Sequence, residues 1–142
     1  MALTDTAARQ AKPREKGYTL ADSLGLTLYI ADTGYTHSST GRRHIRRFAV
    51  GADGCSLSGG EIFAECSIDL YDGFRIDTEG NLWVGAGDGV HCIAPDGCLI
   101  GKIRVPEVVA NVCFGGVQRK QLFALLPQRG NERGRIKFAI IG

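Results

Sequence analysis

Asp72 is the residue whose type and position first suggest chemistry in this sequence. It stands directly before Gly73, a short apolar segment, a turn at Gly80 and a second apolar segment, so its carboxylate lies at the start of a predicted β-hairpin. A carboxylate in such a place can bind a hard divalent cation or remove a proton from water. The competing interpretation is that Asp72 caps its own loop, which is a common use of Asp before Gly.

Asn111 is a second candidate, because residues 109–116 can be laid over residues 70–77 so that Asn111 aligns with Asp72. One repeat later it is predicted to point the same way and to bind a substrate oxygen. The alternative is an Asn that satisfies backbone groups between two neighbouring sheets. Asp32 ends another apolar segment, and we favour a turn residue there over an acid that faces a central channel.

Other kinds of site are not favoured by the residue patterns. The glycine-rich segment 85–89 lies between two strand patterns and no helix pattern follows it, which argues against a phosphate site. His91 and Cys92 are adjacent on a predicted strand and project to opposite faces, which argues against zinc. Without a G-x-S-x-G motif or a Cys and His at a known spacing, metal-assisted hydrolysis is the enzymatic interpretation that residues support.

Composition bounds the class of protein. The 142 residues are 44% hydrophobic and 23% charged with a net charge of +2, which is typical of a globular chain and implies no nucleic-acid partner. Five cysteines without a C-x-x-C predict reduced core thiols. Residues 1–17 are polar and without periodicity, which predicts a poorly ordered leader before a folded region at 18–142. With no apolar run long enough for a bilayer and no signal-peptide pattern, we expect a soluble, cytoplasmic protein without a membrane partner.

Short apolar segments separated by glycine turns predict an all-β fold that positions these side chains. Three turns place Gly directly after an acidic residue, at Gly54, Gly80 and Gly97, as a type I turn closed by a left-handed Gly requires. The expected strands are 26–32, 44–50, 61–66, 73–77, 81–86, 89–93, 99–105, 109–114, 121–126 and 135–141, with a Gly/Ser/Thr-rich loop inserted at 34–43.

A repeat organises these strands. The segments Leu-Tyr-Ile at 28–30, Leu-Trp-Val at 82–84 and Leu-Phe-Ala at 122–124 recur at the spacing of four-stranded propeller blades. The sequence therefore predicts a partial β-propeller of about two and a half blades. Uncovered blade faces and strand edges would favour self-association.

The segments 28–33, 72–77, 80–83, 87–90 and 113–116 together resemble the SMP-30/gluconolactonase family of six-bladed β-propeller lactone hydrolases. The resemblance covers roughly residues 18–126 and the second half of a typical family member. It implies hydrolysis of a small sugar-type lactone with a divalent metal, calcium first and zinc or magnesium as alternatives. Asp72 takes the position of the family's metal-binding Asp, and the resemblance implies that it is both metal ligand and general base.

The same resemblance implies four metal ligands, of which this sequence matches only Asp72. Tyr71 stands where the family usually has Pro. The resemblance therefore implies that the chain is incomplete for activity by itself and that it binds metal weakly or not at all. The alternative function is a non-catalytic β-propeller fragment that acts as a binding or assembly module.

Overall fold

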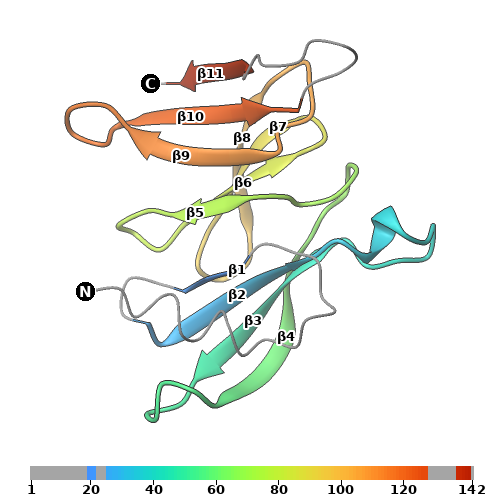
Figure 1. Ribbon diagram of the computed structural model, residues 1–142, viewed down its shortest axis with the longest axis vertical. Coiled ribbons are helices and arrows are strands. Elements are labelled where there is room, and N and C mark those ends of the chain that lie inside the picture. The colour runs from blue at the N-terminus through green and yellow to red at the C-terminus, as the bar shows by residue number, and fades with distance from the viewer. Residues whose placement is uncertain (1–18, 22–24, 128–136, 142) are drawn as a thin grey trace.

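The computed structural model describes residues 19–21, 25–127 and 137–141. Within these ranges the chain forms eleven β-strands, one short 3-10 helix and no α-helix. The strands make three antiparallel sheets that are stacked along the long axis of the molecule (Figure 1). The predicted all-β, partial-propeller fold is confirmed, whereas the leader predicted at 1–17 lies outside the described residues. No helix in the described part is long and apolar enough to cross a membrane.

The first sheet has the strand order β1-β2-β3-β4, and the second has the order β5-β6-β7-β8. The third has the order β11-β10-β9, so two four-stranded sheets and one three-stranded sheet match the expected two and a half blades. The strands are β1 (Thr19–Ala21), β2 (Thr27–Asp32), β3 (His44–Val50), β4 (Leu57–Glu65), β5 (Phe74–Ile76), β6 (Leu82–Ala86), β7 (Gly89–Ile93), β8 (Leu99–Arg104), β9 (Asn111–Gly115), β10 (Gln121–Leu126) and β11 (Lys137–Ile141), and the 3-10 helix η1 (Gly34–Thr36) lies in the predicted loop insertion.

Strands β3, β7 and β10 begin and end at the predicted residues. Strand β4 starts four residues earlier than predicted. Gly59 and Gly60 disfavour a strand by propensity, but Gly59 still pairs with Phe48 of β3, and Gly60 lies at a register shift between Gly59 and Glu61. The sequence pattern does not predict β1, since three residues are too few to show an alternation. The strand nevertheless pairs with β2 along its length.

The predicted hairpin turns are confirmed at all three positions. Gly54, Gly80 and Gly97 have φ angles of +68°, +84° and +91°. Each also donates its N–H to the carbonyl oxygen three residues earlier, as in the 3.1 Å bond from Gly80 to Asp77. The left-handed conformation is what makes glycine necessary at these tips.

Two apolar clusters join the three sheets. The larger one lies between the first and second sheets and includes Ile45, Phe74 and Leu82, each at most 1% exposed. The smaller one lies between the second and third sheets around Val109, Val112 and Ala124. Each cluster packs one sheet against the next. This packing also restrains the connections that run from one sheet to the next.

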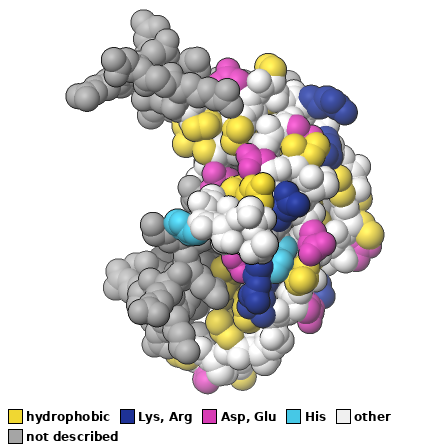
Figure 2. Space-filling model, turned by 90° about the vertical axis from the view of Figure 1, so that its right-hand side faces the viewer, with side chains coloured by type: hydrophobic (Ala, Val, Ile, Leu, Met, Phe, Trp, Pro, Cys, Tyr) yellow, Lys and Arg dark blue, Asp and Glu magenta, His cyan; other side chains and the backbone are white. Residues whose placement is uncertain are grey.

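Charges on the surface are mixed. Figure 2 shows the molecule from the right-hand side of Figure 1. On this face, Lys and Arg side chains are interspersed with Asp and Glu side chains. Among the described residues, this face carries no broad patch of one charge sign, so specific side chains rather than overall charge must define a site there.

Candidate active site

Asp72 lies in the connection between β4 and β5 and is half-buried. Its N–H donates to Gly85 O of β6 at 3.0 Å, and the next residue, Gly73, donates to Ala110 O at 2.9 Å. Gly73 O in turn accepts the N–H of Gly85 at 3.0 Å. The backbone that carries the carboxylate is therefore fixed at the junction of the second and third sheets.

Asn111 begins β9 and lies against the residue that follows Asp72. Its Oδ1 accepts the N–H of Val112 at 2.8 Å and lies 3.5 Å from Arg75 Nη1. The same side chain fills the space that a Cβ at Gly73 would occupy. The structure thus places Asn111 against Gly73, the residue that follows Asp72. The Nδ2 group is the part of the Asn111 amide that these contacts leave to donate.

The strand registers correct the predicted alignment of Asn111 with Asp72. Phe74 pairs with Val84 in the second sheet, and Val112 pairs with Ala124 in the third. Because Val84 and Ala124 hold the same place in the repeat, Asn111 corresponds to Gly73 and the alignment is one residue off. A one-residue shift reverses the face to which a strand side chain points, so the repeat gives no support for a shared orientation of Asn111 and Asp72.

A hollow of about 280 Å³ lies beside Asn111. It is lined by Arg75 and by two stretches of the third sheet, 111–113 and 123–125. A larger hollow of about 520 Å³ includes Gly80 and Pro95, which belong to hairpin tips. Asp72 precedes β5 and Gly80 follows it, so the larger hollow lies at the other end of that strand. The smaller hollow is the one associated with a predicted site residue.

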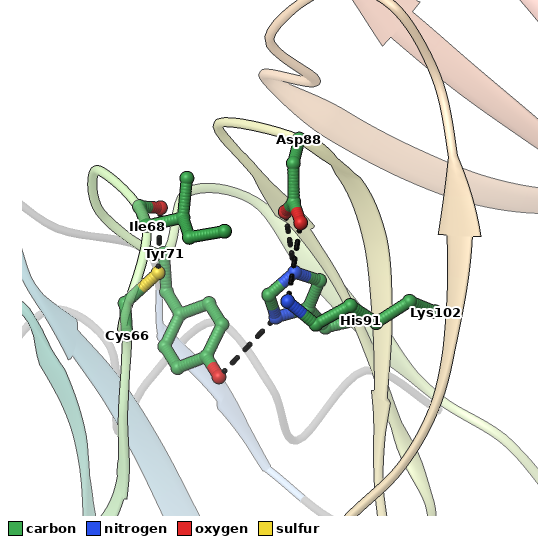
Figure 3. Close-up of polar contacts among 6 residues, drawn as sticks. All are labelled: Cys66, Ile68, Tyr71, Asp88, His91 and Lys102. Atoms are coloured by element: carbon green, nitrogen blue, oxygen red, sulfur yellow. Dashed lines mark hydrogen bonds and ion pairs between the residues drawn. The ribbon is translucent and has the colours of Figure 1, made fainter.

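A polar network includes Tyr71, the residue directly before Asp72 in the chain (Figure 3). His91 Nε2 is 2.6 Å from Asp88 Oδ1, Lys102 Nζ is 3.1 Å from Asp88 Oδ2, and His91 Nδ1 is 3.5 Å from the hydroxyl of Tyr71. Partial burial raises the pKa of Asp88, but hydrogen bonds from His91 and Lys102 outweigh it and hold that pKa below its usual value. Burial raises the pKa of Tyr71.

Sequence reasoning missed this network, although one signal was present. Asp88 and His91 flank the turn that joins β6 to β7, and a carboxylate three residues before a strand His is within reach across such a turn. Tyr71 comes from a different part of the chain, and only the folded arrangement places it on His91. His91 and Cys92 do point to opposite faces, as the alternation along a strand predicts: His91 contacts Tyr71, whereas Cys92 pairs in register with Trp83 and Gly101.

Asp32 is the turn residue that the sequence predicts. Its Oδ1 accepts the N–H of Gly34 at 3.1 Å, which closes the turn after β2. Its other oxygen is 3.7 Å from Nε2 of His44 and 3.8 Å from Nη1 of Arg42.

All five cysteines are free thiols, but the prediction of core thiols holds for only two of them. Cys66 and Cys92 are buried, and burial raises the pKa of both. Cys55, Cys98 and Cys113 are exposed. The prediction rests on the general tendency of cysteine to be buried, which does not hold for Cys55 and Cys98 beside hairpin turns or for Cys113, which is exposed on β9.

Residues 18–125 match the SMP-30/Gluconolactonase/LRE-like region. The chain belongs to this family. It is 39% identical to a gluconolactonase of Zymomonas mobilis over 57 residues, which cover 39% of the chain and 16% of that protein.

Several solved structures are similar to this family member. A gluconolactonase from Xanthomonas campestris is 33% identical with a TM-score of 0.59, over 70% of this chain and 30% of that one. Regucalcin from Agrobacterium tumefaciens, described as a calcium-binding protein, is 22% identical with a TM-score of 0.65, over 82% of this chain and 42% of that one. The chain therefore spans less than half the length of each of these relatives.

The described residues do not fit a complete metal site. They contain no group of three or more His, Cys, Asp or Glu side chains that could hold an ion. The Asn111 oxygen also accepts the N–H of Val112, which competes with ligation. Divalent cations such as calcium take six to eight oxygen ligands, so Asp72 alone falls far short.

Proposed function

We propose that this chain contributes Asp72 and Asn111 to the hydrolysis of a small sugar-type lactone. Family membership supports the reaction class. The observation that carries the assignment to these residues is the hydrogen-bonded junction in which Asp72 and Gly73 are bonded to Gly85 and Ala110 while Asn111 packs on Gly73. A rigid backbone at this point favours catalysis, because a general base works only at a defined distance from its proton.

In the proposed reaction Asp72 accepts a proton from a water molecule as that water attacks the lactone carbonyl carbon. The tetrahedral intermediate collapses by breaking the bond between the carbonyl carbon and the ring oxygen, and the proton is passed to that oxygen. The product is the open-chain hydroxy acid. Asn111 Nδ2 donates a hydrogen bond to a substrate oxygen and so orients the ring relative to Asp72.

The dimensions of the hollow beside Asn111 favour a small substrate. Its volume of about 280 Å³ is just below the roughly 300 to 1,000 Å³ common for ligand sites. Arg75 lies at its border with Nη1 bonded to Phe74 O at 2.7 Å. A guanidinium fixed in this way can offer its remaining N–H groups to hydroxyl or carboxylate oxygens of a sugar acid.

A requirement for a divalent cation is the second part of the proposal. The calcium-binding description of the Agrobacterium neighbour supports testing calcium first, followed by zinc and magnesium. Because the described residues supply too few ligands, the remaining ones would have to come from outside them, and the steps above are assigned to Asp72 and Asn111 only.

The test measures lactone hydrolysis with a pH indicator, in the presence and absence of added calcium. We expect Asp72→Asn to lower kcat/KM by about 10²- to 10⁴-fold, the usual contribution of a general base. Asp69→Asn is a matched control, because it makes the same change in the same connection at an exposed residue with a φ of +63°, which Asn tolerates. Asn111→Ala should raise KM more than it lowers kcat.

Unchanged turnover in Asp72→Asn would contradict the proposed role of this residue. If the folded wild-type chain hydrolyses no lactone with any of the three cations, the alternative function as a non-catalytic binding or assembly module is favoured. The shortage of metal ligands among the described residues supports that alternative. Light scattering of the purified chain would then show whether it associates with itself.

A further inference from the structure

The side chains of Lys102, Asp88, His91 and Tyr71 form one continuous polar chain that joins the second sheet to the connection before β5. Lys102 lies on β8 directly opposite His91 on β7, and Asp88 lies in the turn before β7. Figure 3 shows the imidazole of His91 between the Asp88 carboxylate and the Tyr71 hydroxyl. Tyr71 is 3% exposed and His91 is 1% exposed, so the centre of the chain is closed to solvent.

The hydrogen-bond roles along this chain follow from Asp88. Its carboxylate accepts from Lys102 Nζ on one oxygen and lies 2.6 Å from His91 Nε2 on the other. Nε2 must therefore carry a hydrogen, and a neutral imidazole then has its lone pair on Nδ1. That nitrogen accepts the Tyr71 O–H, whose ring also packs edge-on against the imidazole with centroids 5.6 Å apart.

Tyr71 is joined to Asp72 by one peptide bond, so whatever holds the Tyr71 ring also restricts the Asp72 backbone. The connection lies tightly over the turn between β6 and β7, because a Cβ at Gly87 would meet the Cβ of Asp69 and the carbonyl of Ile68. On the other side, the N–H groups of Asp72 and Gly73 are bonded to β6 and to Ala110. Asp72 is thus restrained from both directions.

We propose that Tyr71, His91, Asp88 and Lys102 are positioning residues that fix the Asp72 carboxylate for the reaction. This inference rests on the proposed function of Asp72 and adds the residues that act through it. A buried imidazole without partners is costly, and an apolar side chain would fill the same space. Hydrogen bonds depend on direction, whereas apolar packing does not. The polar chain therefore restrains the orientation of the connection more than an apolar side chain of the same size would.

The test uses the full chain without substrate and measures exchange of backbone amide hydrogens by NMR. Tyr71→Phe removes the hydroxyl and keeps the ring, and we expect it to speed exchange of the Asp72 and Gly73 amides by roughly tenfold. Asp88→Asn should act in the same direction. Tyr29→Phe is the matched control, because Tyr29 lies in the same apolar cluster but in β2. It should leave these two amides unchanged.

A second readout is the nitrogen spectrum of the imidazole, where His91 should carry its hydrogen on Nε2. Wild-type exchange rates in Tyr71→Phe, or a hydrogen on Nδ1 of His91, would overturn the inference. If lactones are turned over, Tyr71→Phe should lower kcat and leave KM unchanged, whereas a purely structural residue would change only the amount of folded protein. If no lactone is hydrolysed but the exchange rates respond as expected, the proposed function fails and the positioning of Asp72 stands.

Discussion

Gly73 and Asn111 face each other across the boundary between the second and third sheets, and the Asn111 side chain occupies the space where Gly73 would otherwise carry a Cβ. The neighbouring bond from Gly73 N to Ala110 O is 2.9 Å long. Glycine at position 73 therefore permits the close approach of two blades at the candidate site, independently of any turn geometry.

The first prediction is that Gly73→Ala lowers the free energy of unfolding by about 1 to 3 kcal/mol, the usual cost of overpacking a tight contact. Chemical denaturation measures this change. Gly101→Ala is the control, since the nearest atom to its added Cβ is Cys92 Cβ at 4.0 Å. Equal stability of the two variants would show that the second and third sheets can move apart at Gly73 at little cost in free energy.

The second prediction concerns Asp77 and acid stability. Its carboxylate accepts from Trp83 Nε1 at 2.8 Å and from the N–H groups of Glu79 and Asn81, each at 2.9 Å. Partial burial raises the pKa of Asp77, but these hydrogen bonds outweigh it and hold the pKa below 3.8. We expect Asp77→Asn to cost about 1 to 3 kcal/mol at neutral pH.

The pH dependence of this effect has a definite sign. A lowered pKa in the folded state stabilises the protein above the ordinary value of 3.8, and this stabilisation is lost as pH falls through the lower folded pKa. Wild type and Asp77→Asn should therefore converge in acid, as followed by Trp83 fluorescence. Asp96→Asn, at an exposed tip where Asp96 accepts the Cys98 N–H, should have the smaller effect. A constant difference at all pH values would contradict the role of the charge.

The third prediction is that three of the five thiols react with a disulfide reagent in the native protein. Cys55, Cys98 and Cys113 are exposed, whereas Cys66 and Cys92 are buried. Burial raises the pKa of Cys66 and Cys92, and the neighbouring Asp96 carboxylate raises the pKa of the exposed Cys98. The thiolate is the reactive form, so the buried pair should react only after denaturation. Counting released thiolate before and after adding guanidinium measures both classes, and five fast thiols would contradict the described sheet packing.

The fourth prediction is that Phe74→Ala lowers the free energy of unfolding by about 3 to 5 kcal/mol, as expected for a large buried aromatic. Phe74 is 1% exposed and lies in the cluster that joins the first and second sheets. Val117→Ala is the control, because Val117 is fully exposed. A loss below about 1 kcal/mol in thermal or chemical unfolding would mean that the two sheets are held together in another way.

The hairpins could be predicted from the sequence because they depend on neighbouring residues. Glycines one step after an acidic residue indicate the turns at Gly54, Gly80 and Gly97, and short apolar segments between glycine turns indicate strands such as β3 and β7. Asp72 and Asn111 could be selected in the same way, from their place relative to those hairpins. These features need only the backbone conformations that a few consecutive residues allow.

Contacts between sheets were decided only by the tertiary structure. The one-residue difference that aligns Asn111 with Gly73 depends on pairing in two separate sheets, and sequence spacing does not contain it. The meeting of Tyr71 with His91 depends on how the connection after β4 crosses the second sheet. Strand registers and sheet packing depend on the whole apolar core. The sequence alone therefore identified the Asp72 carboxylate as a candidate, whereas the fold determined which residues surround it.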